Sequence, residues 1–145
     1  MNPELRRFVQ QADFVHETNE WTSNVWLSRP DVTKADNLLL VRATMDAGRS
    51  HPFHHHPTRE EIIYVVEGKA EQWVGKEYRI LEPGEIAHIP MGTVHGTWNP
   101  FKQRLVFLAI LAPAGAPGPD IVDMEHEEPW KSVRKGNPPE GDFQS

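Results

Sequence analysis

The chain contains no cysteine, and this absence removes several kinds of site from consideration. Without thiols the protein has no disulfide, no thiolate-ligated metal and no cysteine nucleophile. A cysteine-free chain fits a reducing compartment. The basic pair Arg6 and Arg7 is not followed by the long apolar run of a secretory signal. We therefore expect a cytoplasmic protein.

Positive charge and long hydrophobic runs are also scarce. Lys and Arg number 15 against 21 Asp and Glu, which gives a net charge of -6 at pH 7. An acidic surface repels phosphate backbones and anionic lipid leaflets, so neither nucleic acid nor a membrane is an expected partner. The sequence has no run of about 18 apolar residues, the length that a membrane-spanning helix needs. A small molecule is the partner that we expect instead.

The length of 145 residues suits one domain, which we divide into three segments. The first segment is residues 1–36. A weak helical pattern over residues 1–15 predicts a short helix or an ordered arm, and a first strand is expected at 23–28. Residues 37–111 are rich in β-forming residues. Residues 112–145 open with alanine, proline and glycine, and they predict an extended tail over the domain or over a partner subunit.

Short apolar runs, punctuated by glycine and proline, fill the central segment. The run from Leu38 to Met45 is rich in leucine and valine and is short enough to be a buried strand. Gly75 with Lys76 is typical of a tight hairpin turn. Short strands at regular spacing indicate an all-β sandwich or barrel. The predicted strands are 38–45, 61–66, 70–74, 77–81, 86–89, 93–98 and 104–111.

Histidines in two distant parts of this segment can meet at one end of such a barrel. His54 and His56 point to the same face of an extended strand, and His55 points to the opposite face. Glu61 opens the next predicted strand after a short bend, and it can face back towards the pair. His95 arrives from a strand far along the chain, behind a turn that contains proline and glycine.

Three imidazoles and one carboxylate form a ligand set of mixed nitrogen and hard oxygen. Such a set suits Fe, Mn, Ni, Cu or Zn and disfavours Ca or Mg, so we predict one divalent transition metal ion per chain. Its ligands would be His54, His56, Glu61 and His95. An octahedral ion would keep two positions open for water or substrate, as catalytic sites do. A polar barrel mouth without metal is the alternative interpretation.

Two longer motifs carry a resemblance to a known family. The first, G(X)5HXH(X)3–4E(X)6G, is matched by Gly48, His54, His56, Glu61 and Gly68. The second, G(X)5PXG(X)2H(X)3N, is matched by Gly84, Pro90, Gly92, His95 and Asn99. Over residues 37–111 the chain therefore resembles the cupin family. The resemblance implies a double-stranded β-helix, a jelly-roll-like barrel that is usually a homodimer and binds metal through the four side chains named above.

Residue types alone give less guidance on the rest of the site. Candidates for the wall of a substrate pocket are Ile63, Val65, Thr97 and Phe107. Packing of the core explains the apolar ones without any function. Arg42 lies in an otherwise apolar strand, where it could anchor a substrate carboxylate or be a surface charge of an edge strand. The sequence favours neither role for Arg42.

Several other titratable residues have two interpretations each. His51 could reach the pocket as a proton donor, but we favour an exposed position at the start of a strand. His55 is expected in the core or at a subunit interface. His88 could line the pocket or lie on the surface. Glu60 is an alternative carboxylate ligand, but Glu61 preserves the spacing of the first motif and is preferred.

Three functions fit this site, because proteins of one fold perform many reactions. The first, which the sequence favours, is a metal-dependent dioxygenase that acts on a small oxygen-bearing molecule, with Glu61 doubling as a base. The second is redox-neutral chemistry on a sugar, uronate or small carboxylate by an isomerase, lyase or decarboxylase, with His51 or His88 as candidates for moving a proton. The third is a non-enzymatic module that senses or stores a small ligand or metal.

Overall fold

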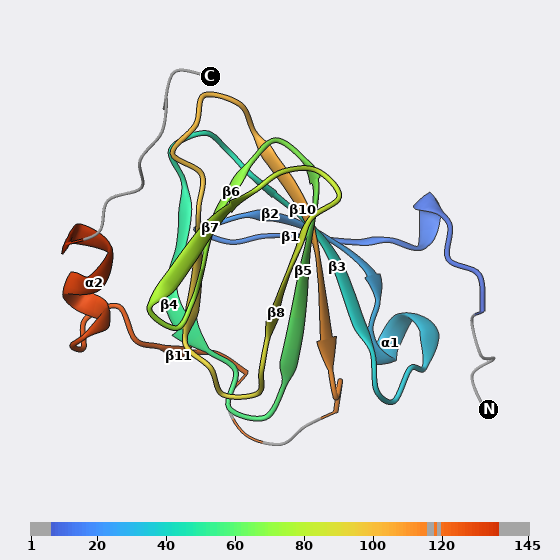
Figure 1. Ribbon diagram of the computed structural model, residues 1–145. Helices are drawn as coiled ribbons and strands as arrows, with labels where there is room; N and C mark the ends of the chain where they lie inside the picture. Colours follow the sequence, from blue (N-terminus) through green and yellow to red (C-terminus); the bar gives the residue numbers. More distant parts are fainter. Residues whose placement is uncertain (1–6, 116–117, 119, 137–145) are drawn as a thin grey trace.

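Two antiparallel sheets face each other and form a barrel in the computed structural model, which describes residues 7–115, 118 and 120–136 (Figure 1). The first sheet has six strands in the order β1-β2-β3-β10-β5-β8, and the second has five in the order β11-β4-β9-β6-β7. Neighbouring strands pair antiparallel throughout. This arrangement confirms the predicted all-β class and the double-stranded β-helix.

The elements have the following bounds. The six-stranded sheet contains β1 (Val15–Thr18), β2 (Ser23–Ser28), β3 (Leu39–Met45), β10 (Leu105–Ala112), β5 (Glu60–Glu67) and β8 (Ile86–Ile89). The five-stranded sheet contains β11 (Val122–Asp123), β4 (Ser50–His55), β9 (His95–Trp98), β6 (Ala70–Val74) and β7 (Glu77–Leu81). The helical segments are the 3-10 turn η1 (Gln11–Asp13), α1 (Pro30–Thr33) and α2 (Trp130–Gly136). Within the described residues, no helix has the length and apolar character needed to span a membrane.

Alternate residues of the strands fill the space between the sheets. On β3 the odd-numbered residues from Leu39 to Met45 are buried, and the residues between them are partly exposed. On β5 the same alternation buries Glu61, Ile63 and Val65. Because successive side chains of a strand point to opposite faces, one face builds the core and the other faces outward. Burial of the inner faces is the main force that closes the barrel.

The turn between β5 and β6 requires glycine at position 68. Gly68 has a positive φ of 79°, and a Cβ atom there would collide with the carbonyl oxygen of Arg104. Only glycine occupies such a position without steric cost. This turn leads the chain from the six-stranded sheet into β6, which pairs with β9.

The predicted strand ranges agree with the structure to within two residues at each end. The ranges 23–28, 70–74, 77–81 and 86–89 coincide with β2, β6, β7 and β8. The sequence did not predict β1, α1, β11 or α2. These elements are short and largely exposed, so they carry no clear periodicity, and they form by pairing with or packing on strands already in place. The segment boundaries at residues 36 and 111 stay predictions.

The N-terminal arm and the C-terminal tail can be compared with the helix or arm and the extended tail that the sequence predicts. Residues 7–14 form an arm with a single 3-10 turn, and residues 1–6 lie outside the described residues. The tail is more structured than the predicted extended arm, because β11 joins the five-stranded sheet beside β4 and α2 follows it. Residues 137–145 lie outside the described residues as well.

The helix α2 packs on the outer face of the five-stranded sheet, at the left of the barrel in Figure 1. The ring of Trp130 lies 5.3 Å from that of Phe53, between centroids. Two guanidinium nitrogens of Arg134 each donate a 2.7 Å hydrogen bond to the fully buried carboxylate of Glu71. The indole nitrogen of Trp73 donates to the same carboxylate at 2.6 Å. The cost of burying this charge is thereby compensated.

We expect Arg134→Met to destabilise the protein, because it leaves the buried Glu71 carboxylate without its cation. The loss should be on the order of 2 to 3 kcal/mol, below the cost for a fully buried pair, since the Arg134 side chain is 31% exposed. Denaturant unfolding measures this change. The double variant Arg134→Met with Glu71→Gln removes the unpaired charge and should recover part of the loss. Equal stability of the wild type and Arg134→Met would contradict this account of the tail.

Candidate metal centre

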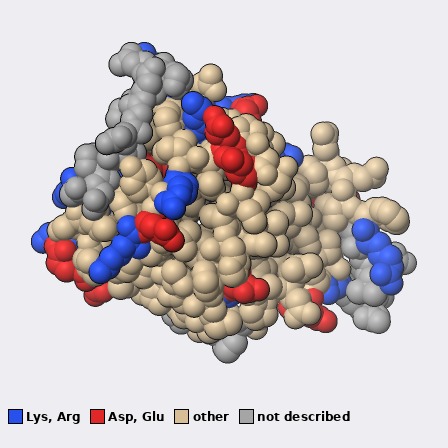
Figure 2. All heavy atoms as spheres, viewed as in Figure 1, with Lys and Arg blue, Asp and Glu red and all other residues tan. Residues whose placement is uncertain are grey.

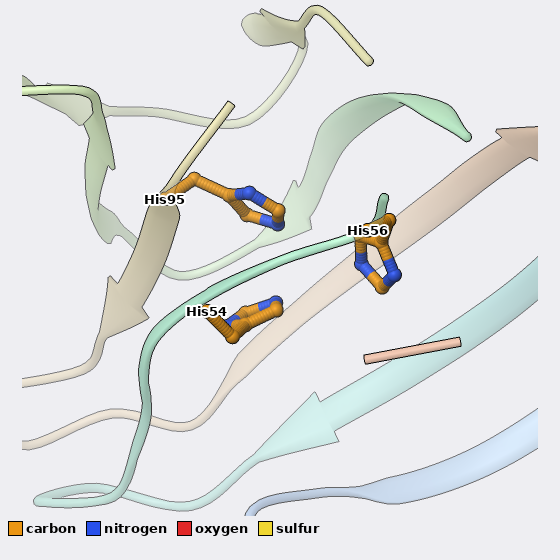
Figure 3. Close-up of side chains that lie close together, drawn as sticks. All are labelled: His54, His56 and His95. Carbon is orange, nitrogen blue, oxygen red and sulfur yellow. The ribbon is translucent and has the colours of Figure 1, made fainter. Parts of the chain in front are cut away.

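Three histidines from two paired strands gather at one point inside the barrel. His54 lies on β4, His56 directly follows β4, and His95 is the first residue of β9. His54 and His95 are register partners. All three side chains are buried, and one ring nitrogen of each lies within 4.8 Å of those of the other two. Figure 3 shows the three rings turned towards a common space.

Hydrogen bonds to nearby backbone carbonyls decide which nitrogen carries the proton in two of these rings. Nδ1 of His54 lies 2.6 Å from the carbonyl oxygen of Pro52, and Nδ1 of His95 lies 2.9 Å from that of Thr93. A carbonyl oxygen can only accept a hydrogen bond, so Nδ1 must be the donor. In the neutral ring Nε2 then keeps a free lone pair.

The third ring is fixed in the same way by a residue far along the chain. Nδ1 of His56 lies 2.8 Å from the carbonyl oxygen of Asp120, and it therefore also donates. All three histidines accordingly present Nε2 as the nitrogen that is free to bind a metal ion. Such outer hydrogen bonds orient the histidine ligands of metal sites and raise their basicity.

Glu61 joins the histidines from the opposite sheet. It is buried near the start of β5. Its Oε1 lies 3.2 Å from Nε2 of His56 and 3.0 Å from Nε2 of His95. Within the described residues, Oε1 of Glu61 and Nε2 of His95 are buried atoms without a hydrogen-bond partner. A hydrogen bond within the described protein therefore does not explain why Oε1 of Glu61 lies so close to Nε2 of His95.

This set of donor atoms fits a cation. Lone pairs on Nε2 and negative charge on the carboxylate face each other in a buried space, which is unfavourable unless a positive charge lies between them. Nitrogen and carboxylate ligands together suit divalent transition metals better than Ca or Mg. The cluster of His54, His56 and His95 could therefore hold a metal ion. Glu61 is placed to be a further ligand.

The surroundings keep His54 in the protonation state that metal binding needs. Burial lowers the pKa of His54 well below its ordinary value, and neighbouring His51 and His95 lower it further. Near neutral pH, His54 is therefore neutral. For Glu61, burial on its own raises the pKa, and it is hydrogen bonds and positive charge from protonated His56 and His95 that bring the pKa below its ordinary value.

A fourth histidine reaches the site, so the exposed position that the sequence favoured for His51 is wrong. The ring of His51 stacks between Trp21, at a centroid distance of 4.1 Å, and His54, at 3.7 Å. Its Nε2 is buried and has no hydrogen-bond partner in the described part of the chain. In a regular strand residues 51 and 54 would point to opposite faces. The register of β4 against β9 shifts between His51 and His54, so both side chains reach the same face of the strand.

The histidines line a cavity of about 160 Å³ between the two sheets. Of the residues predicted for the pocket wall, Ile63, Thr97 and Phe107 line this cavity. The hydroxyl of Thr97 donates a 2.5 Å hydrogen bond to the side-chain oxygen of Gln72, so it is held in place. The assignment of Val65 to the pocket wall was wrong, because its side chain is fully buried in the hydrophobic core.

Arg42 faces away from the cavity, so the suggested contact with a substrate carboxylate is wrong. It lies on β3 between the buried residues Val41 and Ala43, and alternation therefore turns it outward. Its guanidinium lies 5.9 Å from the centre of the Phe14 ring. Among the described residues that line the cavity, none is a lysine or an arginine.

The remaining candidate side chains lie outside the cluster. His55 is half-buried, is the register partner of Val122 on β11, and does not line the cavity. His88 is exposed on β8, where its Nε2 lies 3.5 Å from a carboxylate oxygen of Glu60. The surface interpretation of His88 therefore describes the structure, and Glu60 points away from the metal cluster.

Two segments outside residues 37–111 supply cavity residues that the sequence analysis did not name. Trp21 lies in the loop before β2, and Asp120 and Ile121 lie just before β11. A second hollow of about 350 Å³ adjoins the cavity, and the two share Trp21, His51, His54 and Ile121. No spacing or periodicity marks these residues in the sequence, since only strand pairing brings them to the site.

Comparison with known families agrees with this geometry. Residues 41–111 match the family model described as "Cupin domain". This chain contains a small cupin domain. The matched residues include all four predicted ligands, and the cupin domain is formed by the strands β3 to β10.

Several individual proteins are similar to parts of this chain. The chain is 39% identical over 64 residues to dimethylsulfoniopropionate lyase DddQ from Ruegeria pomeroyi, a match that covers 43% of this chain and 31% of the lyase. The crystal structure of that lyase has a TM-score of 0.66 at 23% identity and covers 81% of this chain and 64% of its own.

Two further solved structures share the fold. KdgF from Halomonas sp. has a TM-score of 0.65 at 21% identity, over 74% of this chain and 94% of its own. An oxalate decarboxylase from Lactobacillus farciminis has a TM-score of 0.66 at 19% identity, over 87% of this chain and 39% of its own. At these identities the structural likenesses show the cupin fold alone.

We expect acid to destabilise the metal-free protein, partly through His51. Burial lowers the pKa of His51 to about 3 from the ordinary value of 6.5. Between these values the unfolded chain binds more protons than the folded one, so stability decreases as the pH falls. One such group contributes a slope of about 1.4 kcal/mol per pH unit.

Denaturant unfolding of the metal-free protein at a series of pH values measures this slope. His51→Phe keeps an aromatic ring in the stack but cannot titrate, so its stability should depend less steeply on pH than that of the wild type. An unchanged slope in His51→Phe would show that His51 does not carry this effect.

Proposed function

We propose that this chain is a metal-dependent enzyme that acts on a small oxygen-bearing molecule. Its divalent transition metal ion would be held by His54, His56, Glu61 and His95. The observation that supports this proposal is the buried convergence of three histidine rings with the Glu61 carboxylate, in which Nε2 of His95 and Oε1 of Glu61 lack a hydrogen-bond partner among the described residues. When bound, such an ion supplies Lewis-acid polarisation of a substrate oxygen at its open positions.

The cavity limits the substrate that this chain can take. A volume of about 160 Å³ is below the range of pockets for drug-sized ligands, so the part of the substrate that enters this cavity should contain few heavy atoms. Ile63 and Phe107 offer apolar contacts, and Thr97 offers a hydroxyl already held by Gln72. The described lining has no lysine or arginine. A substrate carboxylate inside this cavity would therefore find its positive partner at the metal ion, since Arg49 lines only the adjoining hollow.

Within this proposal we favour redox-neutral lyase or decarboxylase chemistry on a small carboxylate. The sequence alone favoured dioxygenase chemistry, but the relative that is 39% identical over 64 residues is a lyase. A carboxylate that binds directly at a Lewis acid also suits the cation-free cavity wall. His51, as a neutral imidazole with an unpartnered Nε2 beside His54, would hydrogen-bond the substrate and orient it.

Elemental analysis of untagged protein tests the metal centre first. We expect about one equivalent of a transition metal in the wild type and strong loss in His56→Ala and His95→Ala, because each removes a ligand. His55→Ala is the matched control, since His55 lies outside the cavity, and it should retain the metal. Equal loss in all three variants would contradict the ligand assignment. A wild type that stays empty after reconstitution would overturn the metal proposal.

The metal-loaded protein then tests the reaction class with a panel of small carboxylates. Redox-neutral turnover should proceed equally under argon and under air, with no uptake of oxygen. Oxygen consumption in step with substrate loss would overturn the lyase or decarboxylase assignment and favour a dioxygenase. Ligands that raise the melting temperature without any turnover would favour a non-enzymatic binding module instead.

We also propose that the chain forms a homodimer through the outer face of the six-stranded sheet. Tyr64 and Val66 on β5 and Ile86 on β8 are 39%, 44% and 50% exposed, and Tyr64 is the register partner of Ile86. Figure 2 shows a broad uncharged area on the viewed face over β5 and β8. Apolar patches of this kind mark interaction sites, and a two-fold dimer pairs the same patch on both subunits.

Light scattering after size exclusion tests the dimer. We expect Ile86→Lys to shift the protein to a monomer, because it places like charges opposite each other in a symmetric interface. Met91→Lys is the control, as Met91 is 58% exposed but lies in the turn before β9. A monomeric wild type, or a dimer that Ile86→Lys leaves intact, would contradict the proposed interface.

A further inference from the structure

The backbone carbonyl that orients His56 comes from a different part of the chain than those that orient the other two histidines. His54 and His95 each donate to the carbonyl two residues before them. His56 donates instead to Asp120, which is 64 residues away in the C-terminal segment. The orientation of this ring therefore depends on how the C-terminal segment is held beside the barrel.

One arginine holds that segment. Nε of Arg59 donates to the carbonyl oxygen of Pro113 at 2.9 Å, and Nη2 donates to that of Ala114 at 2.7 Å. Nη1 pairs with the carboxylate of Asp120. The rigid fork of a guanidinium thus connects the end of β10 to the residue that faces His56. Only 12% of the Arg59 side chain is exposed, and its bonds to the two carbonyls are partly buried, whereas the Asp120 side chain is 57% exposed.

The part of the chain that follows Asp120 is anchored by the five-stranded sheet. Val122 and Asp123 pair with His55 and His54 as β11, and the backbone nitrogen of Met124 donates to the carbonyl oxygen of Phe53 at 2.9 Å. β11 has only two residues, which is a weak anchor by itself. Arg59 supplies the second point of attachment, and the Asp120 carbonyl lies between the two.

We propose that Arg59 is a positioning residue of the metal centre, which acts by holding the Asp120 carbonyl against Nδ1 of His56. The inference rests on the proposed metal function. Without this acceptor, His56 is free to rotate or to move its proton to Nε2, and either change removes a lone pair from the site. Arg59 itself does not line the cavity, so it acts through Asp120 alone.

The first readout needs no metal. Nitrogen-15 NMR of metal-free protein distinguishes the two neutral tautomers of histidine. We expect the wild type to carry the His56 proton on Nδ1 only, and Arg59→Met to populate the Nε2 tautomer. The second readout is affinity for a divalent transition metal, measured by competition with a chromophoric chelator. Loss of an outer-sphere partner of this kind lowers metal affinity about 10- to 100-fold.

Two controls separate positioning from general destabilisation. Arg104→Met removes an arginine from an exposed ion pair with Glu67, far from Asp120 in the fold, and should change neither readout. Asp120→Asn keeps the backbone carbonyl and a side-chain oxygen for Arg59, and it should resemble the wild type. Asp120→Ala breaks the side-chain link to Arg59 and also removes the carboxylate oxygen that lies 3.7 Å from Nδ1 of His56, so it should move both readouts in the direction of Arg59→Met.

The outcomes are distinguishable. A folded Arg59→Met with wild-type tautomer and affinity would overturn the inference. If Arg59→Met does not fold, the contrast between Asp120→Ala and Asp120→Asn decides, and equality of the two overturns it. If the wild type binds no metal, the proposed function fails, but the tautomer measurement still decides whether Arg59 positions His56.

Discussion

Hydrogen bonds from three imidazole Nδ1 atoms to backbone carbonyls are the interaction on which the whole site depends. Because carbonyls only accept, they force the proton onto Nδ1 and leave three Nε2 lone pairs directed at one space. Glu61 then adds a carboxylate oxygen about 3 Å from two of these nitrogens. Four acceptors gathered in a buried space carry an electrostatic cost, which a bound cation relieves. The hydrogen bonds of the fold therefore position these four groups without a bound ion.

The barrel supplies the geometry that the sequence spacing alone does not contain. Pairing of β4 with β9 places His54 directly beside His95, although the two are far apart in the chain. Glu61 belongs to the other sheet, so it reaches the histidines only because the two sheets close on each other. A change that loosens the contact between the sheets therefore acts on the metal site as well as on stability.

Much of the fold and of the central site could be predicted because alternation along a strand is a local property. His54 and His56 share a face by spacing, and the apolar runs mark their own strands. Alternation also predicts that Arg42 faces outward, since its neighbours Val41 and Ala43 are apolar and turn inward. His51 could not be placed this way, because a register shift in β4 breaks the alternation. Asp120 carries no local signal, since it reaches the site only through tertiary contacts.

The strand β4 is packed on both of its faces, and this packing fixes the side of the cavity that carries His54. Its inner face carries His54, while Phe53 on its outer face meets Trp73, Trp98 and Trp130. Packing on both faces leaves β4 little freedom to move, so His54 is held in place from behind. On its open side the cavity adjoins the larger hollow, and Trp21 and Ile121 belong to the lining of both. A molecule that reaches the metal centre from this hollow would therefore contact an aromatic and an aliphatic side chain first.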